Sequence, residues 1–100
     1  MIHDFTYIIK CQDYYKIGRA RNVNRRLDTL QIGNPILLEL IRVIPGGHYE
    51  SRLHLIFRHK RIRGEWFKLT AEDLKIEQSE LYKPIKIGKE EYLSNKKDEE

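Results

Sequence analysis

The chain has 100 residues, of which 40% are hydrophobic and 10% aromatic, so it suits one folded domain with a modest core and not a disordered polymer. Its single cysteine, Cys11, excludes an internal disulfide framework and any zinc site built from several cysteines, and we expect it to be a small buried apolar residue. No secretory signal and no membrane-spanning apolar run is visible, which predicts a cytoplasmic protein that does not contact a membrane.

The net charge of +4 is unevenly distributed. Residues 1–70 carry thirteen lysines and arginines against six acidic residues, a net charge of +7, whereas residues 71–100 carry six lysines against nine acidic residues, a net charge of −3. A basic, arginine-rich body favours a polyanionic partner, with nucleic acid the first choice.

The first predicted elements are two strands of a hairpin. Residues 4–11 alternate as a strand should, Gln12–Asp13 suits a two-residue turn, and residues 14–18 form the return strand. This register places Tyr7 and Lys16 on one face of the sheet as diagonal neighbours.

Two helices and a strand follow. A helix over residues 22–31 begins at the N-cap Asn22 and ends before a glycine–asparagine–proline breaker. Residues 36–44 are apolar on both faces and predict a strand at the centre of the sheet. A second helix covers residues 48–60, with its apolar residues at helical spacing.

The remaining elements are shorter. Residues 64–69 predict an extended segment with two core aromatic residues, Trp66 and Phe67, and residues 70–76 predict a third helix. The order β-β-α-β-α-(β)-α predicts an α/β (α+β) fold: a small, mainly antiparallel, three-stranded sheet flanked by helices. We assign residues 1–78 to this domain and residues 79–100 to a charged, partly disordered C-terminal extension.

Two places carry candidate chemistry. Glu50 and His54 lie four residues apart on the second helix, off its apolar stripe, and Arg58 continues the row. They suit a metal ligand with its neighbour or an acid–base pair, but equally an exposed pair on a helix surface. Arg26 lies at the edge of the apolar face of the first helix, where its guanidinium can bind a phosphate, while Arg25 points further toward solvent. The alternative for both arginines is a basic surface without a specific role.

The ordered motifs "TYIIKCQDYYKIGRARNVNRRLDTLQ", "ESRLH" and "RGEWF" resemble the GIY-YIG endonuclease superfamily. The similarity is greatest to the branch whose second signature reads "KIG", often labelled a phage-type or meiotically up-regulated DNA-binding domain. It extends from about Phe5 to Leu69.

The resemblance implies a role for each matching residue. Tyr7 matches the tyrosine of the first signature, although "FT" here replaces the preceding "GI". Lys16 stands at the tyrosine of the second signature, Arg26 matches the arginine that contacts the scissile phosphate, Glu50 matches the acid that binds one divalent metal ion, and His54 matches a histidine common in this branch.

The resemblance further implies a single Mg²⁺ or Mn²⁺ held by Glu50, with either Tyr7 or Lys16 taking the proton of the attacking water. The superfamily's late asparagine has no clear counterpart; Glu65 lies in that neighbourhood but is not equated with it. The charges expected to steer the DNA backbone are Arg19, Arg21, Arg25, Arg58, Lys60, Arg61 and Arg63.

Three functions are therefore considered. The first is a small metal-dependent DNA endonuclease or nicking module, with a homodimer or a recognition partner supplying specificity. The second is a non-catalytic DNA-binding module on the same scaffold, since a fold alone does not fix activity. The third is an interaction or regulatory domain whose tail docks a partner.

Overall fold

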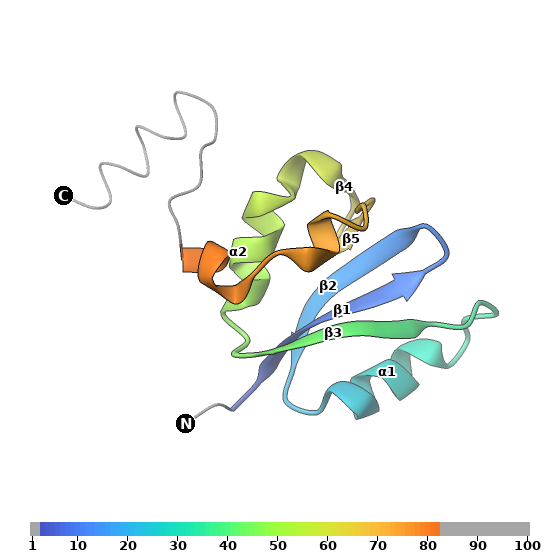
Figure 1. Ribbon diagram of the computed structural model, residues 1–100. Helices are drawn as coiled ribbons and strands as arrows, with labels where there is room; N and C mark the ends of the chain where they lie inside the picture. The colour runs from blue at the N-terminus through green and yellow to red at the C-terminus, as the bar shows by residue number, and fades with distance from the viewer. Residues whose placement is uncertain (1–2, 83–100) are drawn as a thin grey trace.

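A computed structural model describes residues 3–82, and these form an α+β unit around one antiparallel sheet (Figure 1). The expected fold class is confirmed, and the sheet has five strands because two short strands join the three expected ones. The strands are β1 (Phe5–Cys11), β2 (Tyr14–Ala20), β3 (Glu39–Pro45), β4 (Arg61–Arg63) and β5 (Trp66–Phe67).

The hairpin register is confirmed. β1 and β2 pair antiparallel, with Tyr7 opposite Gly18 and Ile9 opposite Lys16, so Tyr7 and Lys16 share a sheet face. The turn uses a left-handed backbone at Gln12, whose φ is 56°.

The expected central position of residues 36–44 is wrong. The strand order is β3-β1-β2-β5-β4, so β3 is an edge strand, and it begins only at Glu39. Its residues are apolar on both sides because a helix covers each face of the sheet. Leu40 packs on the side of α1 and Ile44 on the side of α2.

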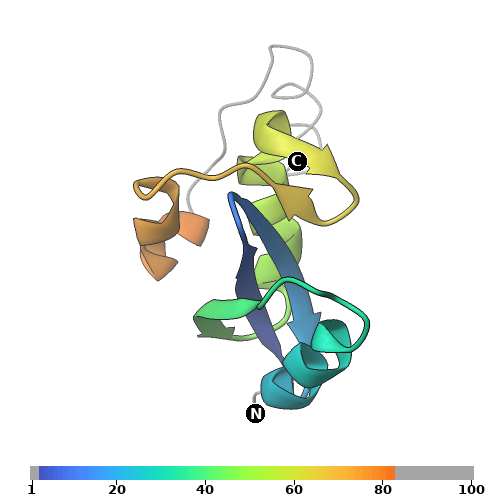
Figure 2. The same ribbon diagram turned by 90° about the vertical axis from the view of Figure 1, so that its right-hand side faces the viewer.

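The two helices pack on opposite faces of the sheet (Figure 2). Helix α1 (Val23–Gln31) begins where the Asn22 side chain accepts a hydrogen bond from the Arg25 backbone, as the sequence predicts. It covers Tyr7 and Ile9 in what we call the α1-side core.

Helix α2 (Tyr49–Ile56) covers the larger α2-side core, which includes Ile8, Ile17 and the fully buried Phe67. It is shorter than expected: residues 58–60 form a separate 3-10 turn, η1 (Arg58–Lys60), ahead of β4.

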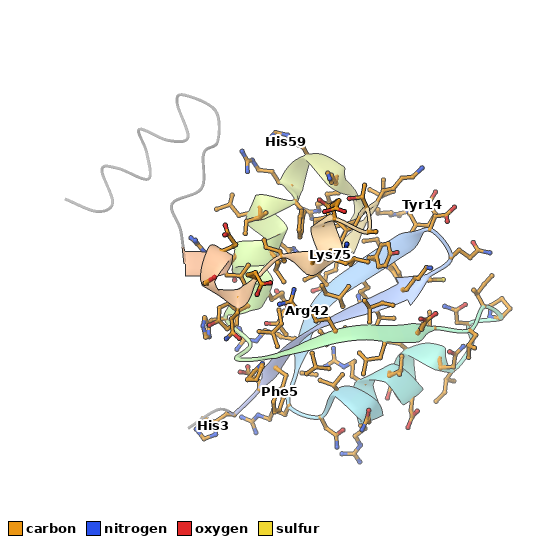
Figure 3. All side chains as sticks on the ribbon, viewed as in Figure 1. His3, Phe5, Tyr14, Arg42, His59 and Lys75 are labelled. Atoms are coloured by element: carbon orange, nitrogen blue, oxygen red, sulfur yellow. The ribbon has the colours of Figure 1, made fainter. Side chains whose placement is uncertain are left out.

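The third helix predicted over residues 70–76 is also wrong, since only the 3-10 turn η2 (Asp73–Lys75) forms there. A further 3-10 turn, η3 (Gln78–Tyr82), follows it. The Arg42 guanidinium, labelled in Figure 3, donates to the Ile76 carbonyl and fastens this segment to the sheet. Leu81 is fully buried in the α2-side core, so the packed part of the chain reaches at least that residue.

Disorder was predicted for part of residues 79–100; residues 83–100 lie outside the described part of the chain. Among residues 3–82, no helix is both long and apolar enough to cross a membrane.

Candidate metal and phosphate site

The site lies on the edge of β2 where β5 stops. β5 pairs with β2 only at Tyr15 and Lys16. At the next residue, Ile17, the backbone N–H still donates to the Glu65 carbonyl at 3.0 Å, but the Ile17 carbonyl accepts from the His54 side chain at 2.9 Å. A side chain of α2 thus takes the place of the next strand partner and brings α2 to this edge.

Three side chains converge there. Glu50, His54 and Glu65 each offer a ligand atom, and these atoms all lie within 4.8 Å of one another. All three residues are half-buried. Glu50 and His54 come from successive turns of α2, and Glu65 comes from the turn immediately before β5. Sequence spacing predicts the first pair, whereas the third member is supplied by the tertiary fold.

The hydrogen bond of His54 fixes its tautomer. A backbone carbonyl only accepts, so Nε2 of His54 carries a proton and donates it to Ile17. In the neutral ring Nδ1 then holds the free lone pair. A histidine whose second ring nitrogen is anchored on a carbonyl in this way has the outer-shell arrangement found at protein metal sites.

Lys16 closes the site on the side of the sheet. Its Nζ lies 2.8 Å from Oε1 of Glu65, and the Lys16 side chain is only 16% exposed. It also lies 5.7 Å from the centroid of the Trp66 ring. One cation therefore stands beside a carboxylate pair, in a position to contact an anion that approaches the cluster.

The loop between β3 and α2 sets the position of Glu50. Gly46 has φ +109°, a conformation that favours glycine, and its carbonyl accepts from the buried Thr6 hydroxyl at 2.7 Å. The Gly47 N–H donates to the Asp4 carboxylate at 2.9 Å, and a side chain at Gly47 would approach the Asp4 Cγ to 2.5 Å. The start of α2 is thus held against the start of β1.

Arg19 completes that anchor. Its guanidinium donates twice to Asp4, and these hydrogen bonds, with the one from Gly47, hold the pKa of the Asp4 carboxyl below its ordinary value of 3.8. Arg19 was predicted to steer DNA; the structure pairs it with Asp4 and leaves its side chain about half exposed, and the steering role stays a prediction.

Tyr7 reaches toward the same edge from β1. It is fully buried, and its ring lies over Gly18: a Cβ at Gly18 would stand 2.6 Å from the Tyr7 Cζ and closer still to the hydroxyl. Only glycine allows this approach. Among residues 3–82, the Tyr7 hydroxyl has no hydrogen-bond partner, and such a group is costly to bury unless something else binds it.

Arg26 lies outside the cluster of Glu50, His54 and Glu65. It is exposed on α1 and lines a hollow of about 330 Å³ with Arg25 and Ala20. Ala20 is two residues from Gly18 along β2, on the face that carries Tyr7. The hollow therefore borders the face on which the Tyr7 hydroxyl lies.

The other predicted DNA-steering residues fall into two groups. Lys60 forms an ion pair with Asp73 at 2.6 Å, and Arg58 donates to the Leu55 carbonyl at 2.7 Å, so both support the chain's own structure. The side chains that remain exposed are Arg21, Arg25, Arg61 and Arg63.

Two residues that were expected in the core, Trp66 and Cys11, are only half-buried. Phe67 is fully buried, but Trp66 is only half-buried on the opposite face, and Cys11 is half-buried beside it in a surface hollow. Glu65 was not identified as a site residue from the sequence; its signals were the motif "RGEWF" and its position in the neighbourhood of the superfamily's late asparagine, with which it was not equated.

Comparison with known families identifies the chain. The T5orf172 domain model matches residues 4–80, which is most of the chain and nearly all of its described part. The chain therefore belongs to the T5orf172 domain family, a phage-type family related to GIY-YIG and HNH-like nucleases. No curated protein and no solved structure matches it.

Proposed function

We propose that this protein is a metal-dependent DNA endonuclease of GIY-YIG type that hydrolyses or nicks a phosphodiester at the open edge of β2. The observation that carries the proposal is the convergence of Glu50, His54 and Glu65 beside Lys16. Family membership supports a nuclease or DNA-binding module, and the basic body of the chain supports a polyanionic substrate.

The three donors fit one divalent ion. Ligand oxygens lie about 2.1 Å from Mg²⁺, so two ligands of one ion are at most about 4.2 Å apart, and atoms within 4.8 Å need only a small side-chain shift. The two carboxylates suit Mg²⁺ or Mn²⁺, whereas an imidazole ligand is more usual for transition-metal ions than for Mg²⁺. When bound, the ion would neutralise charge on the phosphate and polarise a water molecule.

The chain's own groups would divide the remaining work. Lys16, the cationic partner of Glu65, would donate a hydrogen bond to a phosphate oxygen. The Tyr7 oxygen, which has no partner among residues 3–82, would accept from the attacking water and align it. Arg26, exposed beside the face that carries Tyr7, would brace the phosphate from the side of α1.

A second candidate is a DNA-binding module without catalysis. The Lys16–Glu65 ion pair favours this candidate, because the Lys16 ammonium group already binds one of the three carboxylate or imidazole groups that would hold the metal ion. Such a module would bind DNA in a salt-sensitive way and leave it uncut.

Plasmid nicking separates the two. Supercoiled plasmid is incubated with the protein in Mg²⁺, Mn²⁺ or EDTA, next to Glu50→Gln and the matched variant Glu39→Gln, which changes an exposed acid on β3. We expect cutting only with the metal ion, at least a hundredfold loss in Glu50→Gln and wild-type activity in Glu39→Gln. Salt-sensitive binding of plasmid without any cutting would reject the nuclease and support the binding module.

A further inference from the structure

A second site lies on the same sheet face as Lys16. It is a hollow of about 280 Å³ formed where the tip of the β1–β2 hairpin meets β4 and β5, and its lining is Cys11, Gln12, Tyr14, Ile62, Arg63 and Trp66. Figure 3 labels Tyr14 near this hairpin tip.

The strand register shows why these side chains face one way. Trp66 lies opposite Lys16 on β2 and opposite Arg63 on β4, and cross-strand partners project from the same face. Tyr14 is two residues from Lys16, so it projects from that face too. Trp66, which lines the hollow, therefore stands between it and Lys16 of the metal and phosphate site.

The hollow is an apolar surface that the core does not use. Tyr14 is 41% exposed and Ile62 is 56% exposed, whereas Phe67, the neighbour of Trp66 on β5, is fully buried on the other face. Exposed aromatic and aliphatic side chains grouped in a hollow are typical of a binding site.

The charges around the hollow indicate the kind of ligand. Arg63 lines the hollow, and Lys16 lies beside the Trp66 ring. A flat apolar ring that is covalently attached to a negatively charged group would fit both the aromatic lining and the nearby cations. An unpaired nucleobase attached to its phosphate has this chemistry.

We propose that the hollow is a base-stacking subsite, which receives one unpaired nucleobase next to the phosphate held at Lys16. The position of that phosphate rests on the proposed function. The substrate class follows: single strands, flaps, bulges or frayed ends bind better than continuous duplex, because a stacked and paired base cannot enter the hollow.

Trp66 provides a direct probe, because it is the single tryptophan of the chain. The fluorescence of Trp66 is measured in EDTA while one of three ligands is added: a single strand of about 12 nucleotides, the same strand made abasic throughout, or the corresponding duplex. The affinity for each ligand is measured separately, by the fluorescence anisotropy of a labelled strand. We expect the single strand to quench Trp66 and to bind roughly tenfold more tightly than the abasic strand, since stacking on an aromatic side chain contributes about a factor of ten or more per base.

Tyr14→Ala should weaken single-strand binding by roughly tenfold and leave abasic-strand binding unchanged. Because Tyr14 is exposed, this variant should retain the wild-type circular dichroism spectrum. Leu37→Ala, which removes another exposed apolar side chain that does not line the hollow, is the control.

The subsite is overturned if abasic and normal strands bind alike, if Trp66 fluorescence does not change on binding, or if no strand binds. The proposed nuclease is tested separately by cutting in Mg²⁺. Plasmid nicking with no base-dependent binding rejects the subsite alone, and base-dependent binding with no nicking supports the subsite and rejects the nuclease.

Discussion

Tyr7 combines complete burial with a hydroxyl that has no partner among residues 3–82. A polar group buried in this way costs about 1–3 kcal/mol. Folding alone would favour phenylalanine, which fills the same space over Gly18. We therefore propose that the Tyr7 hydroxyl forms a hydrogen bond with a bound water molecule or with the substrate.

Tyr7→Phe tests this explanation. We expect cleavage to fall about 10²–10⁴-fold, the range for loss of a group that assists proton transfer, while the free energy of unfolding stays equal or rises by up to about 3 kcal/mol. Plasmid nicking and urea unfolding measure the two effects. Tyr15→Phe, on the opposite face of the same strand pair, is the control, and undiminished nicking by Tyr7→Phe would remove the hydroxyl from the mechanism.

At the scale of elements, the site depends on how α2 is joined to the sheet. The loop before α2 is held by Thr6 and by the Asp4 carboxylate, which also binds Arg19. The anchor lies three residues before Glu50, so it positions the cluster without touching it.

Asp4→Asn should make the protein less stable at pH 6 and lower its cleavage rate. The pKa of Asp4 is held below 3.8 by Arg19 and Gly47, so its contribution to stability is complete above pH 3.8 and disappears as the pH falls through the lowered pKa. The stability difference between the wild type and Asp4→Asn should therefore shrink between pH 6 and pH 3.

Urea unfolding followed by Trp66 fluorescence measures this difference. Asp13→Asn, an exposed acid in the hairpin turn, should follow the wild type at both pH values. A stability difference that is constant with pH would show that Asp4 acts by packing and not by its charge.

At the scale of the whole molecule, the sequence predicts elements that local chemistry determines. The hairpin register follows from a two-residue turn and alternating residues, and α1 follows from the Asn22 cap and its apolar stripe. The pair of Glu50 and His54 follows from helical spacing alone.

Features set by tertiary packing were missed. β3 is apolar on both sides because a helix covers each face of the sheet, and this pattern does not distinguish an edge strand from a central one. β5 has two residues, too few to show a period, so neither the outward face of Trp66 nor the position of Glu65 could be predicted.

We propose above all that Glu50, His54 and Glu65 form one divalent-metal site in which Lys16 competes for Glu65. Electron paramagnetic resonance of free Mn²⁺, titrated against the protein, tests it most directly. We predict one bound Mn²⁺ per chain, loss of that binding in Glu50→Gln, wild-type binding in Glu39→Gln, and tighter binding in Lys16→Ala because Glu65 is released. Mn²⁺ binding that is absent, or unchanged by Glu50→Gln, would contradict the account.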